Sequence, residues 1–151
     1  MVEERLVALG IELPPAPAPL ASYIPVTVAG DLVFVAGQVP LGDGTVLVRG
    51  KAGADVSLEE AQGAARRCAL QALSALRDAL GSLDRVAGIP QVTVYVASAP
   101  GFTDQPKVAN GTSDVLVEIF GDQGRHARVA VGVGELPLGA VVEVAVIARI
   151  G

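Results

Sequence analysis

Two charged side chains in the last third of the chain interrupt segments that otherwise have the pattern of buried strands. Arg128 lies in residues 126–133, and Glu143 is the one acid in residues 140–150. Strand periodicity places the apolar set from Ala127 to Val133 on one face, which we expect to be core, and Arg128 on the other. The neighbours of Arg128 on that second face are small, and this pattern predicts a pocket.

Glu143 poses the sharper physical problem, because a buried carboxylate without a partner is unfavourable. Such a group needs a cationic partner, a raised pKa or a hydrated cavity. An ion pair with Arg128 or Arg149 would satisfy it with a purely structural role. A working site is the other interpretation, in which the arginine holds an anion and the acid handles a proton. The pattern alone leaves both interpretations open.

Other kinds of catalytic site find little support in the sequence. His126 is the only histidine, which argues against a metal cluster and against a Ser–His–Asp set, and a lone histidine at a strand end is usually structural or solvated. Cys68 lies on the apolar stripe of a helix and is expected to be core. No glycine-rich piece matches a phosphate loop or a dinucleotide fingerprint.

Composition narrows the class of protein further. The chain has 151 residues, a formal net charge of −5 and no cluster of lysine and arginine, which argues against binding of a nucleic acid backbone. A single cysteine suits the reducing cytoplasm. The sequence has neither the pattern of a signal peptide nor an apolar run long enough to span a membrane, so we expect a cytoplasmic protein with no membrane partner.

The pattern of helices and strands predicts an α+β fold, with a single mixed β-sheet and two helices packed on one face. Residues 1–21 should form a short helix and a proline-rich arm, and residues 22–151 one domain. The even-numbered residues of the strands at 32–36, 92–96 and 142–150 are apolar and should face the helices. The opposite face is half apolar, so we expect a contact between subunits there. The expected helices span 2–9, 57–80 and 106–120, and the expected strands span 23–28, 32–38, 45–49, 91–98, 126–133 and 140–150.

Three pieces of the sequence carry a resemblance to a known family. The first is residues 23–40, which contain Gly30-Asp31-Leu32-Val33-Phe34-Val35-Ala36-Gly37-Gln38. The second is residues 101–128, which contain Asn110-Gly111. The third is the closing motif around Arg128, Leu136-Pro137 and Val142-Glu143-Val144. From residue 22 to 150 the chain resembles the RidA (YjgF) family of reactive-imine deaminases. The middle piece resembles the branch of that family often called putative endoribonuclease, or endoribonuclease L-PSP-like.

The resemblance implies a chorismate-mutase-like fold, a homotrimer with clefts between subunits, and hydrolysis of enamines or imines such as 2-aminoacrylate and 2-iminopropionate to a 2-keto acid and ammonia. No cofactor would be needed. Arg128 would bind the substrate carboxylate and Glu143 would activate water. Tyr23 and Asn110 would line the cleft, and the Gly37 backbone would bond the substrate nitrogen.

Many relatives carry Ser and Cys where this chain has Ala36 and Ala130, which makes the implied pocket less polar. Two alternatives stay open beside the deaminase. One is a non-catalytic trimer that binds small carboxylates, and the other is an endoribonuclease.

Overall fold

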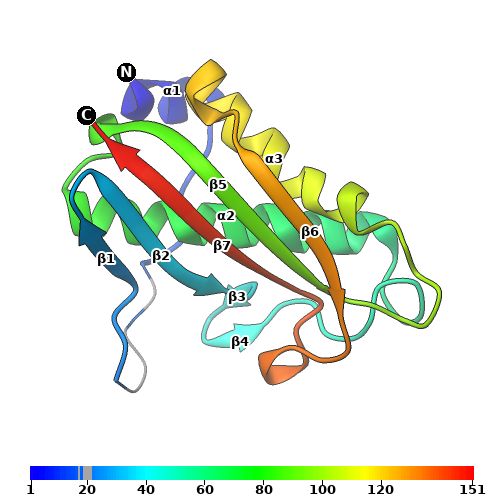
Figure 1. Cartoon of the computed structure of the whole chain (residues 1–151). Coiled ribbons are helices and arrows are strands. Elements are labelled where there is room, and N and C mark those ends of the chain that lie inside the picture. Colours follow the sequence, from blue (N-terminus) through cyan, green and yellow to red (C-terminus); the bar gives the residue numbers. More distant parts are fainter. Residues whose placement is uncertain (17, 19–21) are drawn as a thin grey trace.

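The computed structural model describes residues 1–16, 18 and 22–151. A five-stranded sheet has the order β1-β2-β7-β5-β6, in which β5 and β6 are parallel and the other neighbours antiparallel. Two long helices cover one face of this sheet, and no helix among the described residues covers the other (Figure 1). This is the predicted α+β architecture with one main mixed sheet, but the predicted single sheet needs a correction, because residues 41–42 and 45–46 pair in a separate two-stranded sheet. The elements are α1 (Val2–Leu9), β1 (Val26–Ala29), β2 (Leu32–Gln38), β3 (Leu41–Gly42), β4 (Thr45–Val46), α2 (Leu58–Leu80), β5 (Val86–Ala97), α3 (Gln105–Phe120), β6 (Ala127–Val133) and β7 (Val142–Ile150), with short 3-10 turns at Leu83–Arg85, Gly121–Gly124 and Pro137–Gly139.

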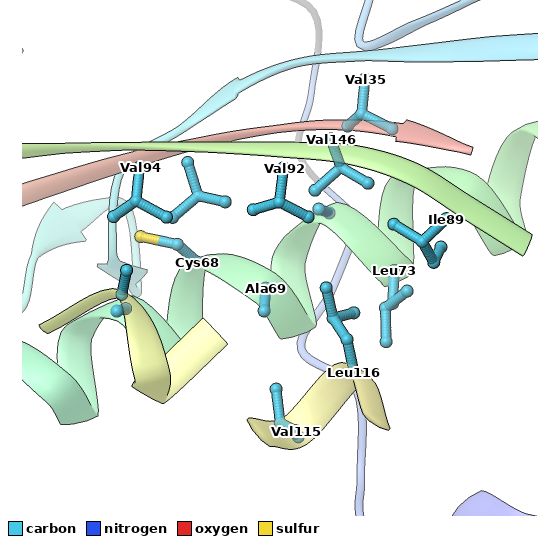
Figure 2. Close-up of a cluster of buried hydrophobic side chains, with 14 of the residues drawn as sticks. Val35, Cys68, Ala69, Leu73, Ile89, Val92, Val94, Val115, Leu116 and Val146 are labelled. Atoms are coloured by element: carbon cyan, nitrogen blue, oxygen red, sulfur yellow. The ribbon is translucent and has the colours of Figure 1, made fainter. Parts of the chain in front are cut away.

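Helix α2 begins and ends where its sequence signals predict. The Ser57 side chain accepts from the Glu60 backbone N–H at 3.1 Å, and the Glu60 carboxylate accepts from the Ser57 N–H at 3.2 Å, which is a capping box. Gly81 ends the helix in the left-handed conformation. The buried face of α2 includes Cys68, whose side chain has no exposed surface and packs among valines of the sheet (Figure 2). Burial raises the pKa of the Cys68 thiol, so the predicted core role is confirmed.

Helix α3 packs on α2 through a close backbone contact at Gly111. A Cβ atom placed on Gly111 would lie 2.9 Å from the carbonyl carbon of Gln62 and closer still to its oxygen. Two hydrogen bonds flank this contact: Thr112 Oγ1 donates to the Ala65 carbonyl at 2.7 Å, and Gln62 Nε2 donates to the Lys107 carbonyl at 2.8 Å. A glycine inside a helix, unfavourable by propensity, is therefore explained by helix–helix packing.

The sheet corrects one predicted strand face. In β2 the residues that face the helices are Val33 and Val35, both buried, whereas Phe34 is 38% exposed on the other side. The prediction of an even-numbered core face was therefore wrong for this strand, although it holds for β5 and β7. Residues 32–35 are apolar on both faces, so periodicity could not choose between them. The pairing with β7 then shifts between Val35 and Gln38, which is a bulge at Ala36 and Gly37.

Strand β6 carries the second correction, because its apolar residues do not form a core face. The parallel register pairs Thr93 with Val129 and Tyr95 with Val131, so these valines lie on the open face of the sheet. Their exposed fractions are 42% for Val129 and 39% for Val131. The apolar side of β6 thus lies on the open face of the sheet, where a partner rather than a helix would cover it.

The N-terminal segment packs on the helix layer. Leu6 of α1 is buried, and the Glu3 carboxylate accepts from the Leu83 backbone N–H at 2.9 Å. Further along, Ser74 Oγ of α2 donates to the Pro14 carbonyl at 2.6 Å. Of the predicted proline-rich arm, residues 17 and 19–21 lie outside the described residues. No helix in the described ranges is long and apolar enough to cross a membrane.

Candidate functional site

Arg128 lies at the outer edge of the sheet, on the side covered by the helices. Its pairing partner across the parallel register is Val92, whose side chain is fully buried beneath the helices. Helix α3 runs beside β6 and presents Asn110 and Ser113, three residues apart and therefore on one side of the helix. Arg128 Nη1 donates to Asn110 Oδ1 at 2.8 Å and to Ser113 Oγ at 3.1 Å. The structure thus brings together two residues predicted for the site, Arg128 and Asn110.

The guanidinium of Arg128 has one edge in use and one edge free. Its two hydrogen bonds to α3 use both N–H groups of Nη1. Nε and Nη2 donate to no residue in the described part of the chain, and the planar pair of donors they form matches a carboxylate. Arg128 and Ser113 line an open cleft of about 600 Å³ with Val117 and Arg125. The free edge therefore has the donor geometry that a carboxylate matches, in a cleft that Asp114 and Glu118 also line.

His126 and Ser113 belong to the same cluster, although sequence reasoning did not assign them to the site. Ser113 Oγ lies 2.8 Å from His126 Nε2, and His126 Nδ1 lies 2.6 Å from the Gly124 carbonyl oxygen. A carbonyl can only accept, so Nδ1 carries a proton, and in the tautomer with the proton on Nδ1 alone, Nε2 accepts from the Ser113 hydroxyl. The helical spacing of Asn110 and Ser113 was the one signal in the sequence that could have indicated this cluster.

Glu143 lies on the opposite face of the sheet from Arg128. It pairs with Tyr95 in the antiparallel register of β5 and β7, while Arg128 shares the helix-covered face with Val92. Burial raises the pKa of the Glu143 carboxyl, and the group forms neither an ion pair nor a hydrogen bond with any described residue. The predicted structural alternative, an ion pair with Arg128 or Arg149, is therefore not formed within one copy of the chain.

Gly37 gives the Glu143 carboxyl the space that it occupies. A Cβ atom at Gly37 would lie 3.0 Å from both Cδ and Oε2 of Glu143. The bulge at the end of β2 thus sets a side-chain-free backbone directly against the acid. These two predicted residues form a second cluster, separate from the one around Arg128. Tyr23, which precedes β1, is 51% exposed and makes no hydrogen bond to a described residue.

The two positions where many relatives are polar divide between the clusters. Ala36 is in the bulge beside Gly37, and Ala130 follows Arg128 on the helix-covered face, paired with the buried Val94. Neither alanine offers a polar group to a ligand. Within the described residues no three His, Cys, Asp or Glu side chains are grouped so as to hold a metal ion. The candidate residues thus form two separate clusters, which we call half-sites: a cationic one at the edge formed by α3 and β6, and an acidic one on the open face of the sheet.

A family model, a related sequence and solved structures all place this chain in the same family. Residues 3–150 match the family model described as YjgF/chorismate mutase-like, putative endoribonuclease. The chain is 47% identical to Protein TCP17 of Trypanosoma cruzi over 144 residues, covering 95% of this chain and 90% of that protein. Two solved structures superpose closely, and each covers 99% of this chain. A putative endoribonuclease of Shewanella oneidensis has 35% identity, a TM-score of 0.94 and 99% of its own length covered. A protein of unknown function from Agrobacterium tumefaciens has 40% identity, a TM-score of 0.90 and 94% covered. The chain belongs to the RidA (YjgF) family, with its chorismate mutase-like fold.

Proposed function

We propose that the protein hydrolyses reactive 2-imino acids, or the enamines that give rise to them, to a 2-keto acid and ammonia. The observation that carries the proposal is the pair of half-sites. Arg128 presents a free carboxylate-binding edge, and Glu143 is a half-buried acid without a partner among the described residues. Membership of the RidA family makes this reaction the natural candidate, because an imine is already electrophilic and needs mainly positioning and a water molecule.

The proposal includes a homotrimer, because the two half-sites lie on opposite faces and cannot meet in one copy. If the α3–β6 edge of one copy packs on the open sheet face of the next, Arg128 of the first approaches Glu143 of the second. Such a heterologous contact closes into a ring when the rotation allows it. The exposed apolar residues Phe34, Val129 and Val131 on that open face support an interface there.

The chemistry divides between the half-sites. Arg128 binds the carboxylate of the imino acid through Nε and Nη2, and the backbone at Gly37 hydrogen-bonds the imine nitrogen. Glu143 takes a proton from water as the water oxygen bonds to the imine carbon, and it returns that proton to the nitrogen to give a carbinolamine. Glu143 then takes the hydroxyl proton and passes it to the amino group as the carbon–nitrogen bond breaks, so that ammonia leaves and the hydroxyl-bearing carbon becomes the ketone. A raised pKa suits this exchange of protons near neutral pH. Asn110 holds Arg128, and Tyr23 of the arm before β1 lines the cleft.

The decisive experiment generates 2-iminopropionate from alanine with an amino-acid oxidase and follows its decay. Wild-type protein should accelerate the decay, and Arg128→Ala should lower the catalysed rate by about 100-fold, because the substrate is no longer positioned. Arg85→Ala is the matched control: this arginine lies on the 3-10 turn after α2 and should leave the rate unchanged. Equal decay with wild type and Arg128→Ala would refute the enzyme.

The proposed assembly has its own test in light scattering coupled to size exclusion. Wild type should elute with the mass of three chains of 15.3 kDa each. Val131→Lys places a charge on the exposed apolar face and should shift the protein to the monomer, with normal secondary structure by circular dichroism. A wild-type monomer would contradict the trimer.

Two other functions are outcomes of the same measurements. A non-catalytic trimer would bind a carboxylate such as pyruvate through Arg128 and leave imine decay unchanged. A ribonuclease, the activity in the names of several relatives, would cleave RNA in preparations freed of contaminating nucleases. The formal charge of −5 and the single histidine weigh against that activity.

A further inference from the structure

We propose that Ser113 and His126 are positioning residues that hold the Arg128 guanidinium in the orientation that captures a carboxylate. This inference rests on the carboxylate-binding role proposed for Arg128. It assigns a role to a hydroxyl and an imidazole that the proposed reaction does not otherwise use. The observation behind it is a continuous chain of hydrogen bonds from the guanidinium to a fixed backbone carbonyl.

With His126 in the tautomer that carries its proton on Nδ1, every hydrogen bond in this chain has one donor and one acceptor. Arg128 can only donate, so Ser113 Oγ accepts from Nη1 at 3.1 Å. The Ser113 hydroxyl then donates its own proton to His126 Nε2 at 2.8 Å. The other ring nitrogen, Nδ1, donates to the Gly124 carbonyl at 2.6 Å. A lone pair at His126 Nε2 thus directs the Ser113 hydroxyl proton away from Arg128, so that an oxygen lone pair of Ser113 faces Nη1.

The far end of the chain is anchored in packed backbone. Gly124 is buried, and a Cβ atom there would lie 2.8 Å from the Leu116 carbonyl carbon, so the turn sits directly on α3. Asn110 and Ser113 come from the same helix. Helix α3 therefore fixes the positions of both acceptors of Nη1 and of the carbonyl that orients His126. A long arginine side chain that would otherwise sample many rotamers is held with its Nε–Nη2 edge free.

A positioning role predicts an effect on binding rather than on the chemical step. Ser113→Ala removes one of the two bonds to Nη1 and should weaken pyruvate binding about tenfold, because a hydrogen bond to a charged group is lost. The same variant should raise KM for the imino acid by a similar factor and change kcat less than twofold. His126→Ala should weaken pyruvate binding several-fold, since Ser113 is then free to rotate.

His126→Gln supplies the conservative rescue. The glutamine side-chain oxygen can take the place of Nε2 and accept from the Ser113 hydroxyl, so pyruvate binding should stay within about twofold of wild type. Thr112→Val is the matched structural control. It removes the neighbouring hydroxyl, which bonds the Ala65 carbonyl on α2, and should lower Tm without changing the Kd for pyruvate.

Titration calorimetry with pyruvate, combined with KM and kcat for 2-iminopropionate, separates the possible failures. If Arg128→Ala abolishes pyruvate binding while Ser113→Ala and His126→Ala bind as wild type does, the positioning role is refuted and the proposed function stands. If Arg128→Ala binds pyruvate normally, or wild type does not bind it, the proposed function and this inference fall together. Equal losses in His126→Ala and His126→Gln would also overturn the inference, because an acceptor at that position would then not matter.

Discussion

Replacing Gly111 by alanine should destabilise the protein, although alanine is the better helix former. Gly111 is where α3 touches α2, and the new methyl group would lie 2.9 Å from the carbonyl carbon of Gln62. Gly63 of α2 is the matched control: it too is helical, but a Cβ atom added there would have nothing within 4 Å. The added methyl group would thus clash with the backbone of Gln62 at Gly111, and it would lie in open space at Gly63.

The two substitutions should have opposite signs. At Gly63 the exchange should stabilise by about 0.5–1 kcal/mol, which is the propensity difference between the two residues. At Gly111 the same gain is opposed by overpacking against backbone, which cannot rotate away as a side chain could. Carbon atoms pack best at about 3.5–4.0 Å, so the helices must part by roughly half an ångström or more. Overpacking typically costs about 1–3 kcal/mol, and the rigid contact here favours the upper end, for a net loss of about 1–2 kcal/mol.

Urea unfolding followed by circular dichroism measures both effects on the same scale. A net loss of that size corresponds to a fall in Tm of about 2–8 °C for a chain of this length, and Gly63→Ala should raise Tm by a smaller amount. Because Asn110 and Ser113 lie on either side of Gly111, Gly111→Ala should also weaken pyruvate binding. A Gly111→Ala protein at least as stable as Gly63→Ala would refute the close contact between the helices.

Three further predictions concern other parts of the chain. Burial raises the pKa of Glu143 in a single copy of the chain, so its contribution to stability is present at acid pH and lost as the pH rises through the folded-state pKa. In the Val131→Lys monomer, where no neighbouring Arg128 acts on the acid, Glu143→Gln should therefore increase stability at neutral pH, with a gap that closes below the ordinary carboxyl pKa of about 4.3, in urea unfolding from pH 4 to 8. Gly37→Ala should push the Glu143 carboxyl aside and lower kcat at least tenfold, while changing the free energy of unfolding by less than about 1 kcal/mol. Gly88→Ala is the control: its added Cβ atom would have its nearest neighbour 3.7 Å away, so kcat should be unchanged. Leu6→Ala should cost about 2–4 kcal/mol in chemical denaturation, because α1 buries this side chain against the body, and a loss under about 0.5 kcal/mol would mean that the helix is not docked.

The helices could be predicted from the sequence because their signals are local. Ser57 and Glu60 form the capping box, and Gly10, Gly81 and Gly121 follow the last residues of the three helices, as predicted. Each signal acts within one turn of the chain and needs no knowledge of the tertiary structure. The predicted fold class followed from the order of these helices and the strands between them.

The strand faces could not all be predicted, because alternation identifies two faces without saying which one is covered. In β2 both faces are apolar, and the pairing of Val33 with Ala148 decides which one meets the helices. In β6 the valines have the pattern of a core face, yet they lie on the open face because Val129 pairs with Thr93. Register between strands that are distant in sequence is a tertiary property, so one error of this kind reverses a whole strand.

The same reasoning explains which parts of the site were missed. Arg128 and Glu143 were singled out by strand periodicity, the resemblance added Asn110 and Gly37, and the contacts of these four residues group them in two pairs. Ser113 carries no signal of its own, and its role depends on how α3 lies along β6. His126 was expected to be structural or solvated, and it is half-buried and bonded at both ring nitrogens, as a structural histidine would be. Its partnership with Ser113 depends on tertiary structure, which the sequence pattern did not indicate.

Assembly would act on Glu143 in two opposite directions, and this makes the acid a reporter of what the interface contains. Covering the open face removes more water from the carboxyl, which alone would raise its pKa further. Bringing Arg128 of a neighbouring copy within a few ångströms would lower the pKa, because an opposite charge favours the ionised form. The proposed site therefore requires the carboxyl of the assembled wild type to titrate at a lower pH than that of the assembled Arg128→Ala variant, in which the same face is covered and the opposite charge is absent, and carbon-13 NMR of glutamate carboxyls can follow both. Equal values in the two assemblies would mean that the interface buries the acid without the arginine, and the two half-sites would then not form one site.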